Sequence, residues 1–311
     1  GGRAIPSSAG GRQGLGGAFV EELVALAPGW SLAAGVRGDW WHNRATAGAI
    51  TSEGGGTRRA RALSPRLSLR WQASGRWALD LAAYRSFRAP TLNELYRGFR
   101  VGDVVTDPNP RLGPERLGGA ELGAGWQGDR RRVRATLFTM SLHDPIANVT
   151  VATSPGLIRR RRENLGRTRS RGVELEGEAE LTSRLSCNAS WLLVDATVVR
   201  FAADPTLEGR RVAQVPRAQL AASLNWRGDA LGAALAARWA GRAFDDDRNN
   251  LALGSFLVID AELARPLPHG LAAFIAVENL FDAEYAVGRT PVETVGAPRL
   301  LRLGLRLHRR G

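Results

Sequence analysis

The sequence of 311 residues contains no lysine, one cysteine (Cys187), one methionine (Met140) and four histidines. A lone cysteine forms no internal disulfide and no multi-cysteine zinc site. A phosphate-binding loop of the Walker type needs a lysine, so that class of nucleotide-binding protein is excluded as well. The histidines lie far apart in the sequence, without the close spacing typical of a metal site. The sequence therefore predicts no metal site and no cofactor.

Long apolar runs are also missing. No stretch approaches the roughly 18 to 20 uncharged apolar residues of a membrane-spanning helix, which excludes a helical membrane protein. The first residues, Gly1 to Ala4, lack the basic segment followed by an apolar segment that marks a signal peptide. Because the only methionine is residue 140, we expect the chain to be a processed product or a fragment of a longer protein.

Positive charge is in excess, with 43 arginines against 30 acidic residues and a formal net charge of +13. The exclusive use of arginine points first to GC-rich coding, so the charge alone is weak evidence for nucleic-acid binding. No G-x-S-x-G motif is present, and no histidine and carboxylate can be placed around a nucleophile. The sequence indicates no enzyme.

The sequence does contain a repeated alternation of apolar and polar residues with period two. Between Arg171 and Leu181, apolar residues alternate with four glutamates, and between Leu301 and His308 four leucines alternate with Arg302, Gly304, Arg306 and His308. In a β-strand this alternation places all the apolar side chains on one face. Each of these segments is therefore expected to separate an apolar environment from a polar one.

Similar segments recur along the chain and predict about fourteen strands. They cover residues 17–27, 30–42, 63–73, 77–87, 115–127, 131–143, 146–152, 169–182, 185–197, 212–226, 230–242, 254–264, 271–281 and 297–308. Most are near the roughly 9 to 11 residues that a tilted strand needs to cross a bilayer. Short and long connections alternate between them, which is typical of an outer-membrane barrel. The predicted fold is all-β, an antiparallel up-and-down transmembrane β-barrel with a polar lumen.

Several stretches resemble the C-terminal barrel of TonB-dependent outer-membrane receptors. They are YRSFRAPTLNELY at 84–96, DPNPRLGPE at 107–115, RENLGRTRSRGVELE at 162–176, VPR at 215–217, VENLFDAEY at 277–285 and GAPR at 296–299. They occur in the family's order from about residue 80 to the end. The resemblance implies a plugged barrel of about 22 strands, of which residues 1–311 would be the latter part, without the plug domain and the first strands. The ending, RLHRRG, departs from the aromatic residue that usually closes family members.

The resemblance implies a function in active transport across the bacterial outer membrane. The cargo would be a scarce nutrient, such as a ferric siderophore, another metal chelate or cobalamin. The energy would come from the inner membrane through the TonB complex, which would contact the missing N-terminal region. Outer-membrane lipid and lipopolysaccharide are the other expected partners.

Two groups of loop residues are candidates for ligand binding. The first mixes aromatic and charged side chains in one long connection and consists of Tyr96, Arg97, Phe99, Arg100 and Asp103. The second is the run of Arg159, Arg160, Arg161 and Arg162, whose forked donors suit the phosphates of lipopolysaccharide or an anionic chelate. The simpler alternative is loop packing for the first group and a solvated basic loop for the second. The run Asp245–Asp247 suggests a hard-cation site or, more simply, a solvated acidic loop.

Two other functions stay open at this stage. A passive porin of about fourteen strands shares the strand pattern, and a plug encoded upstream of Gly1 would argue against it. A soluble basic β protein that binds nucleic acid would lose affinity steeply with salt. The one-sided distribution of long loops argues against this second alternative, and we expect no nucleic-acid partner.

Overall fold

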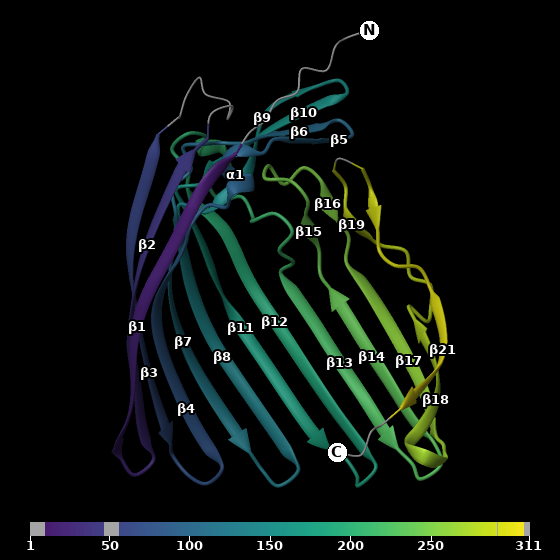
Figure 1. Cartoon of the computed structure of the whole chain (residues 1–311). Helices are drawn as coiled ribbons and strands as arrows, with labels where there is room; N and C mark the ends of the chain where they lie inside the picture. The colour runs from purple at the N-terminus through teal and green to yellow at the C-terminus, as the bar shows by residue number, and fades with distance from the viewer. Residues whose placement is uncertain (1–9, 47–55, 291, 308–311) are drawn as a thin grey trace.

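The computed structural model describes residues 10–46, 56–290 and 292–307. One antiparallel sheet of 13 strands forms a curved wall, here called the barrel wall (Figure 1). Its strands, in spatial order, are β1 (Gly11–Ala27), β2 (Trp30–Ala45), β3 (Thr57–Gln72), β4 (Trp77–Arg88), β7 (Glu115–Gln127), β8 (Arg131–His143), β11 (Arg167–Glu180), β12 (Leu185–Arg200), β13 (Ala218–Arg227), β14 (Gly232–Ala240), β17 (Phe256–Pro266), β18 (Leu271–Glu278) and β21 (Leu300–Leu307).

The wall has the predicted up-and-down connectivity, because each strand pairs with the next wall strand along the chain. The sheet is not closed within the described residues, and β1 and β21 lie at its two edges. The prediction of an all-β, partial barrel is therefore confirmed. Over the described ranges, no helix is long and apolar enough to cross a membrane.

One of the fourteen predicted strands does not belong to the wall. The segment predicted at 146–152 forms β9 (Ile146–Ser154), which lies in a separate four-stranded sheet. The chain leaves the wall here because Asp144 adopts a positive φ of 56° and Pro145 has no N–H to continue the ladder. The strand predicted at 212–226 also starts later, at Ala218, after Gln214 with a φ of 60°.

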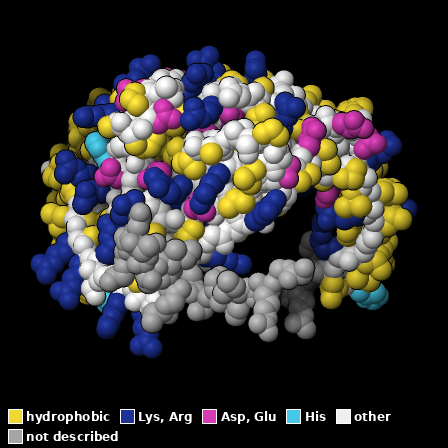
Figure 2. All heavy atoms as spheres, turned by 90° about the horizontal axis from the view of Figure 1, so that it is seen from above, with side chains coloured by type: hydrophobic (Ala, Val, Ile, Leu, Met, Phe, Trp, Pro, Cys, Tyr) yellow, Lys and Arg dark blue, Asp and Glu magenta, His cyan; other side chains and the backbone are white. Residues whose placement is uncertain are grey.

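The two faces of the wall differ as the alternation predicts. On one face, Asp80 of β4 pairs with Arg70 of β3 at 2.9 Å and with Arg134 of β8 at 3.3 Å. On the opposite face, the leucines of β21 (Leu301, Leu303, Leu305 and Leu307) are exposed rather than packed against a second layer. Seen from above, hydrophobic side chains line much of the outer perimeter (Figure 2). The ion-paired face therefore lines the interior and the apolar face points outward.

Tryptophans mark the short-turn end of the outward face. The rings of Trp30 and Trp71 stack with centroids 5.2 Å apart, and Trp77 lies opposite Trp126 on the neighbouring strand. This position suits an indole at a membrane interface. Trp41 is different, because it points inward and is 2 % exposed.

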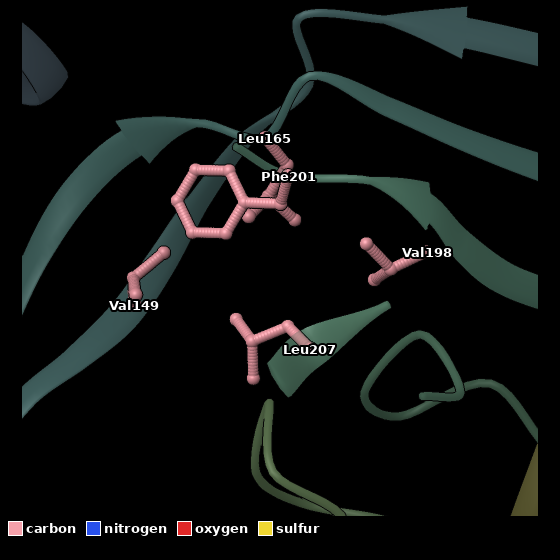
Figure 3. Close-up of a cluster of buried hydrophobic side chains, with 5 residues drawn as sticks. All are labelled: Val149, Leu165, Val198, Phe201 and Leu207. Carbon is pink, nitrogen blue, oxygen red and sulfur yellow. The ribbon is translucent and has the colours of Figure 1, made fainter. Parts of the chain in front are cut away.

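Two clusters of buried hydrophobic side chains hold the long connections against the other end of the wall. The first contains Trp41, Leu95, Tyr96 and Leu112. The second, shown in Figure 3, contains Val149, Leu165, Val198, Phe201 and Leu207. Burial of several large side chains stabilises each cluster by a few kcal/mol per residue, on the order of 1.5 to 3. The long connections at this end are therefore a packed structure.

Candidate functional site at the long-loop end

The long connections build a second, smaller sheet, here called the rim sheet. Its strands, in spatial order, are β5 (Phe99–Val101), β6 (Val104–Asp107), β10 (Leu157–Asn164) and β9. β6 and β10 pair in parallel, with Arg159 opposite Val105 and Arg161 opposite Asp107. In Figure 1 this sheet lies above the barrel wall. Phe99 and Arg100 of the first candidate group and the four arginines of the second are thus brought into one sheet, although more than fifty residues separate them in sequence.

A short helix, α1 (Leu92–Tyr96), connects the wall to the rim sheet. Thr91 and Glu94 form a capping box, in which the Glu94 N–H donates to Thr91 Oγ1 at 3.2 Å and the Thr91 N–H donates to Glu94 Oε2 at 2.7 Å. Arg88, at the end of β4, donates to both carboxylate oxygens of Glu94 at 3.1 Å. Burial opposes ionisation of Glu94, but the hydrogen bonds from Arg88 and Thr91 outweigh it and lower the pKa of this carboxyl.

Tyr96 is the most buried of the candidate residues, at 4 % exposure. Its ring belongs to the cluster around Leu95, and its hydroxyl accepts a hydrogen bond from Asn43 Nδ2 on β2. Gly11, on β1, lies directly beneath the ring, because a Cβ there would be 2.5 Å from Tyr96 Cε2. Tyr96 therefore anchors the loop to the first strands of the wall.

Arg162 joins the two candidate groups. Its Nη1 donates to the carbonyl oxygens of Asn93 and Arg97, the second at 2.9 Å, and its guanidinium lies over the Phe99 ring at 5.4 Å from the centroid. Burial lowers the pKa of Arg162, with an opposing effect from the charge of Glu94. Arg162 is thus engaged in holding β5 and α1 together.

The remaining residues of the first group lie at the surface. Phe99 is 42 % exposed, and Arg97 and Arg100 are exposed as well. Arg100 Nε donates to the Gly102 carbonyl at 2.9 Å, and the Asp103 carbonyl accepts the Ile158 N–H at 2.8 Å. An aromatic face and two guanidinium groups therefore point away from the packed core.

The other three arginines of the second group differ in orientation. Arg159 Nε donates to Asp107 Oδ2 at 2.6 Å, and this contact raises the pKa of Arg159. Arg161 pairs with Glu163 two residues along the same strand. Arg160 instead donates to Thr290 Oγ1 at 3.1 Å, while its buried Nε has no partner in the structure. Arg159 and Arg161 are exposed, whereas Arg160 connects two loops.

Asp245, at the end of the hairpin of β15 (Ala243–Phe244) and β16 (Ala252–Leu253), is a residue whose role the sequence did not reveal. It is 7 % exposed and accepts four hydrogen bonds: from Thr290 Oγ1 at 2.6 Å, from the N–H groups of Thr290 and Arg289 at 2.8 and 3.0 Å, and from Gln214 Nε2 at 2.8 Å. The expectation of a solvated acidic loop is wrong here, because the carboxylate is buried and accepts hydrogen bonds from two other connections.

The neighbouring aspartates have similar structural roles. Asp246, also 7 % exposed, accepts from the N–H groups of Asn250 and Leu251. Asp247 accepts from the Thr150 N–H and hydroxyl, both at 2.9 Å, and so ties the hairpin to β9. Within the described ranges, no group of three or more histidine, cysteine or acidic residues is arranged to hold a metal ion.

We predict that the link between this hairpin and residues 289–290 weakens in acid. Burial disfavours the charged form of Asp245, but its hydrogen bonds from Thr290, Gln214 and the two backbone groups lower its pKa below the ordinary value of about 3.9. The stabilisation is therefore present above that value and is lost as the pH falls toward the lowered pKa. Hydrogen exchange at residues 286–290 is expected to accelerate below about pH 4. An Asp245→Asn variant should show no such pH step.

The inner face of the wall is hollowed beneath the rim sheet. A cavity of about 1010 Å³ is lined by apolar side chains such as Leu15 and Phe87 together with polar ones that include Arg37, Asp39, Arg66, Tyr84 and Glu121. Tyr84 donates to Glu121 at 2.6 Å, which fixes the ring against the wall. The site thus combines exposed aromatic and cationic groups at the rim with a hollow of mixed apolar and polar lining below. This arrangement suits binding of a polar or anionic solute more than bond-breaking chemistry.

Residues 3–280 match the family model described as "TonB dependent receptor-like, beta-barrel". The chain therefore belongs to the family of TonB-dependent receptors. This family comprises transporters and receptors of the outer membrane, so the chain is an outer-membrane β-barrel protein. The resemblance seen in the sequence motifs is confirmed.

Individual relatives agree with this assignment. The ferrichrome outer membrane transporter/phage receptor of Escherichia coli (strain K12) is 35 % identical over 129 residues, which cover 39 % of this chain and 17 % of that protein. The siderophore receptor PiuA of Acinetobacter baumannii superposes with a TM-score of 0.78 at 15 % identity, over 95 % of this chain and 43 % of PiuA. The ferric yersiniabactin uptake receptor FyuA of Yersinia pestis gives 0.74 at 19 % identity, over 96 % and 46 %. The chain therefore spans less than half the length of these relatives.

Proposed function

We propose that this chain supplies the latter part of the barrel of an active transporter for a ferric siderophore, energised through TonB. The observation that carries the proposal is the surface of Phe99, Arg97 and Arg100 at the loop end of a receptor-family wall. Similarity to two siderophore receptors supports a ferric chelate as the cargo in preference to cobalamin. TonB, outer-membrane lipid and lipopolysaccharide are the partners that the proposal entails.

The ligand surface consists of Arg97, at the end of α1, and the exposed side chains of the rim sheet. Arg159 and Arg161, which alternate on β10 next to β6, are exposed but each pairs with an acidic side chain, so they extend the polar surface from Arg100 without adding net charge. Guanidinium groups present planar forks that match carboxylate and catecholate-type oxygens, and an exposed aromatic ring stacks on flat ligand groups. Tyr96 and Arg162 support this surface from beneath through the contacts described above.

We predict that removing the exposed surface weakens siderophore binding. Arg97→Gln combined with Arg100→Gln is expected to raise the Kd for an anionic ferric siderophore by roughly tenfold or more, since charge-assisted hydrogen bonds contribute about 1.5 to 3 kcal/mol each. Quenching of intrinsic tryptophan fluorescence on the whole receptor measures this Kd. Arg76→Gln combined with Arg131→Gln removes the same charge at the short-turn end and should leave binding within about twofold.

Two outcomes would count against the proposal. Equal weakening in both double variants would attribute the effect to overall charge, and absence of binding across a panel of ferric chelates would remove the siderophore assignment. Uptake of a bound chelate by cells lacking TonB would instead favour a passive channel, because energised transport stops without that protein.

A further inference from the structure

Outward-facing arginines gather on β7 and β11, the two wall strands that flank β8, at the long-loop end of the wall. The ladder places Arg116 of β7 opposite His143 of β8, and His143 opposite Arg167 of β11. Arg169 and Arg171 follow on the same face of β11, at every second residue. Cross-strand neighbours lie about 4.5 to 5.5 Å apart at their Cβ atoms, so these side chains form one surface. We call Arg116, Arg167, Arg169 and Arg171 the outer arginine cluster.

The neighbouring residues along the same strands show that the arginines of the cluster point outward. Thr168, between Arg167 and Arg169, is buried under the loops, as are Val194 and Ala196 on the inner face of β12. All four arginines are exposed. Within the described residues, Arg116, Arg167 and Arg169 form no ion pair, and Arg171 approaches Asp195 at 3.4 Å. Asp195 is the single acidic residue at the outward positions of β7, β8, β11 and β12.

The height of the cluster follows from strand geometry. On β7, Arg116 and Trp126 face outward with only Gly118, Ala120, Leu122 and Ala124 between them on that face. Ten residues at about 3.3 Å each, tilted by about 40°, rise roughly 25 Å, which equals the height of the apolar band of an outer-membrane barrel. Trp126 marks the interface at the short-turn end. Arg116 therefore lies at the headgroup level of the outer leaflet.

We propose that the outer arginine cluster binds the phosphorylated headgroup of an outer-leaflet glycolipid of the lipid A type. Arginine is suited to this because its planar fork donates two parallel hydrogen bonds to a phosphate. The apolar side chains just below the cluster, Val173 and Leu175, lie where the acyl chains of the same lipid begin. Charge, apolar surface and height thus select a lipid with phosphate groups at its head.

This assignment differs from the one that the sequence suggested for lipopolysaccharide. The run Arg159–Arg162 lies in the rim sheet, where its members contact Asp107, Thr290, Glu163 and the carbonyls of Asn93 and Arg97. The outer arginine cluster instead lies on the lipid-facing wall. The inference rests on the outer-membrane location and not on the cargo, so a failed siderophore test leaves it standing.

The test uses the whole receptor in detergent, with bis-phosphorylated lipid A as the probe and native mass spectrometry to measure Kd. The variant Arg116→Gln/Arg167→Gln/Arg169→Gln is expected to bind lipid A at least about tenfold more weakly. The control Arg76→Gln/Arg131→Gln/Arg265→Gln removes three charges at the short-turn end and should stay within about twofold. Wild-type protein should bind lipid A stripped of its phosphates about tenfold more weakly as well.

Three outcomes would overturn the inference. They are unchanged binding by the cluster variant, equal loss in the control, and equal affinity for the dephosphorylated lipid. Full displacement of lipid A by inorganic phosphate alone would indicate a free-phosphate site and would also overturn it. If the triple variant does not fold, the single variant Arg169→Gln provides the same comparison. Its affinity for lipid A is expected to fall about threefold, whereas that of the control Arg131→Gln should not change.

Discussion

Gly172→Ala is expected to block assembly of the wall around β8, β11 and β12. A Cβ at position 172 would lie 2.1 Å from the Leu193 carbonyl oxygen and 2.7 Å from the Phe138 ring. The oxygen belongs to the neighbouring strand of the ladder, so relief of the clash would have to displace backbone rather than rotate a side chain. We expect the substitution to destabilise the folded wall by at least about 1 to 3 kcal/mol, which is the typical effect of overpacking a core. The measurement is the fraction of protein that keeps its compact mobility on an unheated gel.

The matched control is Gly118→Ala on β7. A Cβ there would have no heavy atom within 4 Å, although the residue lies in the same sheet. This variant should assemble like the unchanged protein. If both variants assembled equally well, β11 would not pass as close to β12 as the structure places it.

Asp245→Ala is expected to release the hairpin of β15 and β16 from residues 289–290 without disturbing the wall. The substitution removes an acceptor of four hydrogen bonds and leaves part-buried donors of Thr290 and Arg289 without this partner. Loss of hydrogen bonds to a charged group costs about 1.5 to 3 kcal/mol, so local opening should become roughly ten- to a hundredfold more frequent. Hydrogen exchange of residues 243–253 and 286–290 measures the opening.

Asp229→Ala provides the comparison for this second substitution. Asp229 pairs with Arg184 at 2.7 Å across two short turns, and its side chain is 86 % exposed. An exposed pair contributes about 0 to 1 kcal/mol, so exchange in the same segments should not change. Unchanged exchange in Asp245→Ala itself would mean that the hydrophobic clusters alone hold these loops.

The wall was predictable because each of its strands meets two environments. A strand with lipid on one side and a polar interior on the other must alternate, as Leu301 to Leu307 do, and the turns between strands use residues such as Gly29 that accept a positive φ. The same alternation of apolar and polar residues predicts a wall strand at 146–152. Its alternation is real, but Val149 faces a cluster of loop side chains rather than lipid, a difference that periodicity alone does not reveal.

The candidate site was only partly predictable. Composition drew attention to Phe99 and the arginine run, but the pairing of β6 with β10 depends on contacts between segments far apart in the sequence. The sequence does not reveal the role of Asp245, because an acidic run has the same pattern whether solvent or N–H donors surround its carboxylates. The sequence predicts Arg162 and Tyr96 as ligand contacts, whereas in the structure both side chains bond to other residues of the protein.

The parallel pairing of β6 with β10 has a consequence for how such receptors diverge. Neither segment completes its ladder without the other, so inserting or deleting a residue in 104–107 would shift every pairing with 158–161. Transplanting one of these segments from a relative would leave a mismatched edge. Exchange of the proposed cargo-binding surface by recombination should therefore require both segments to be inherited together.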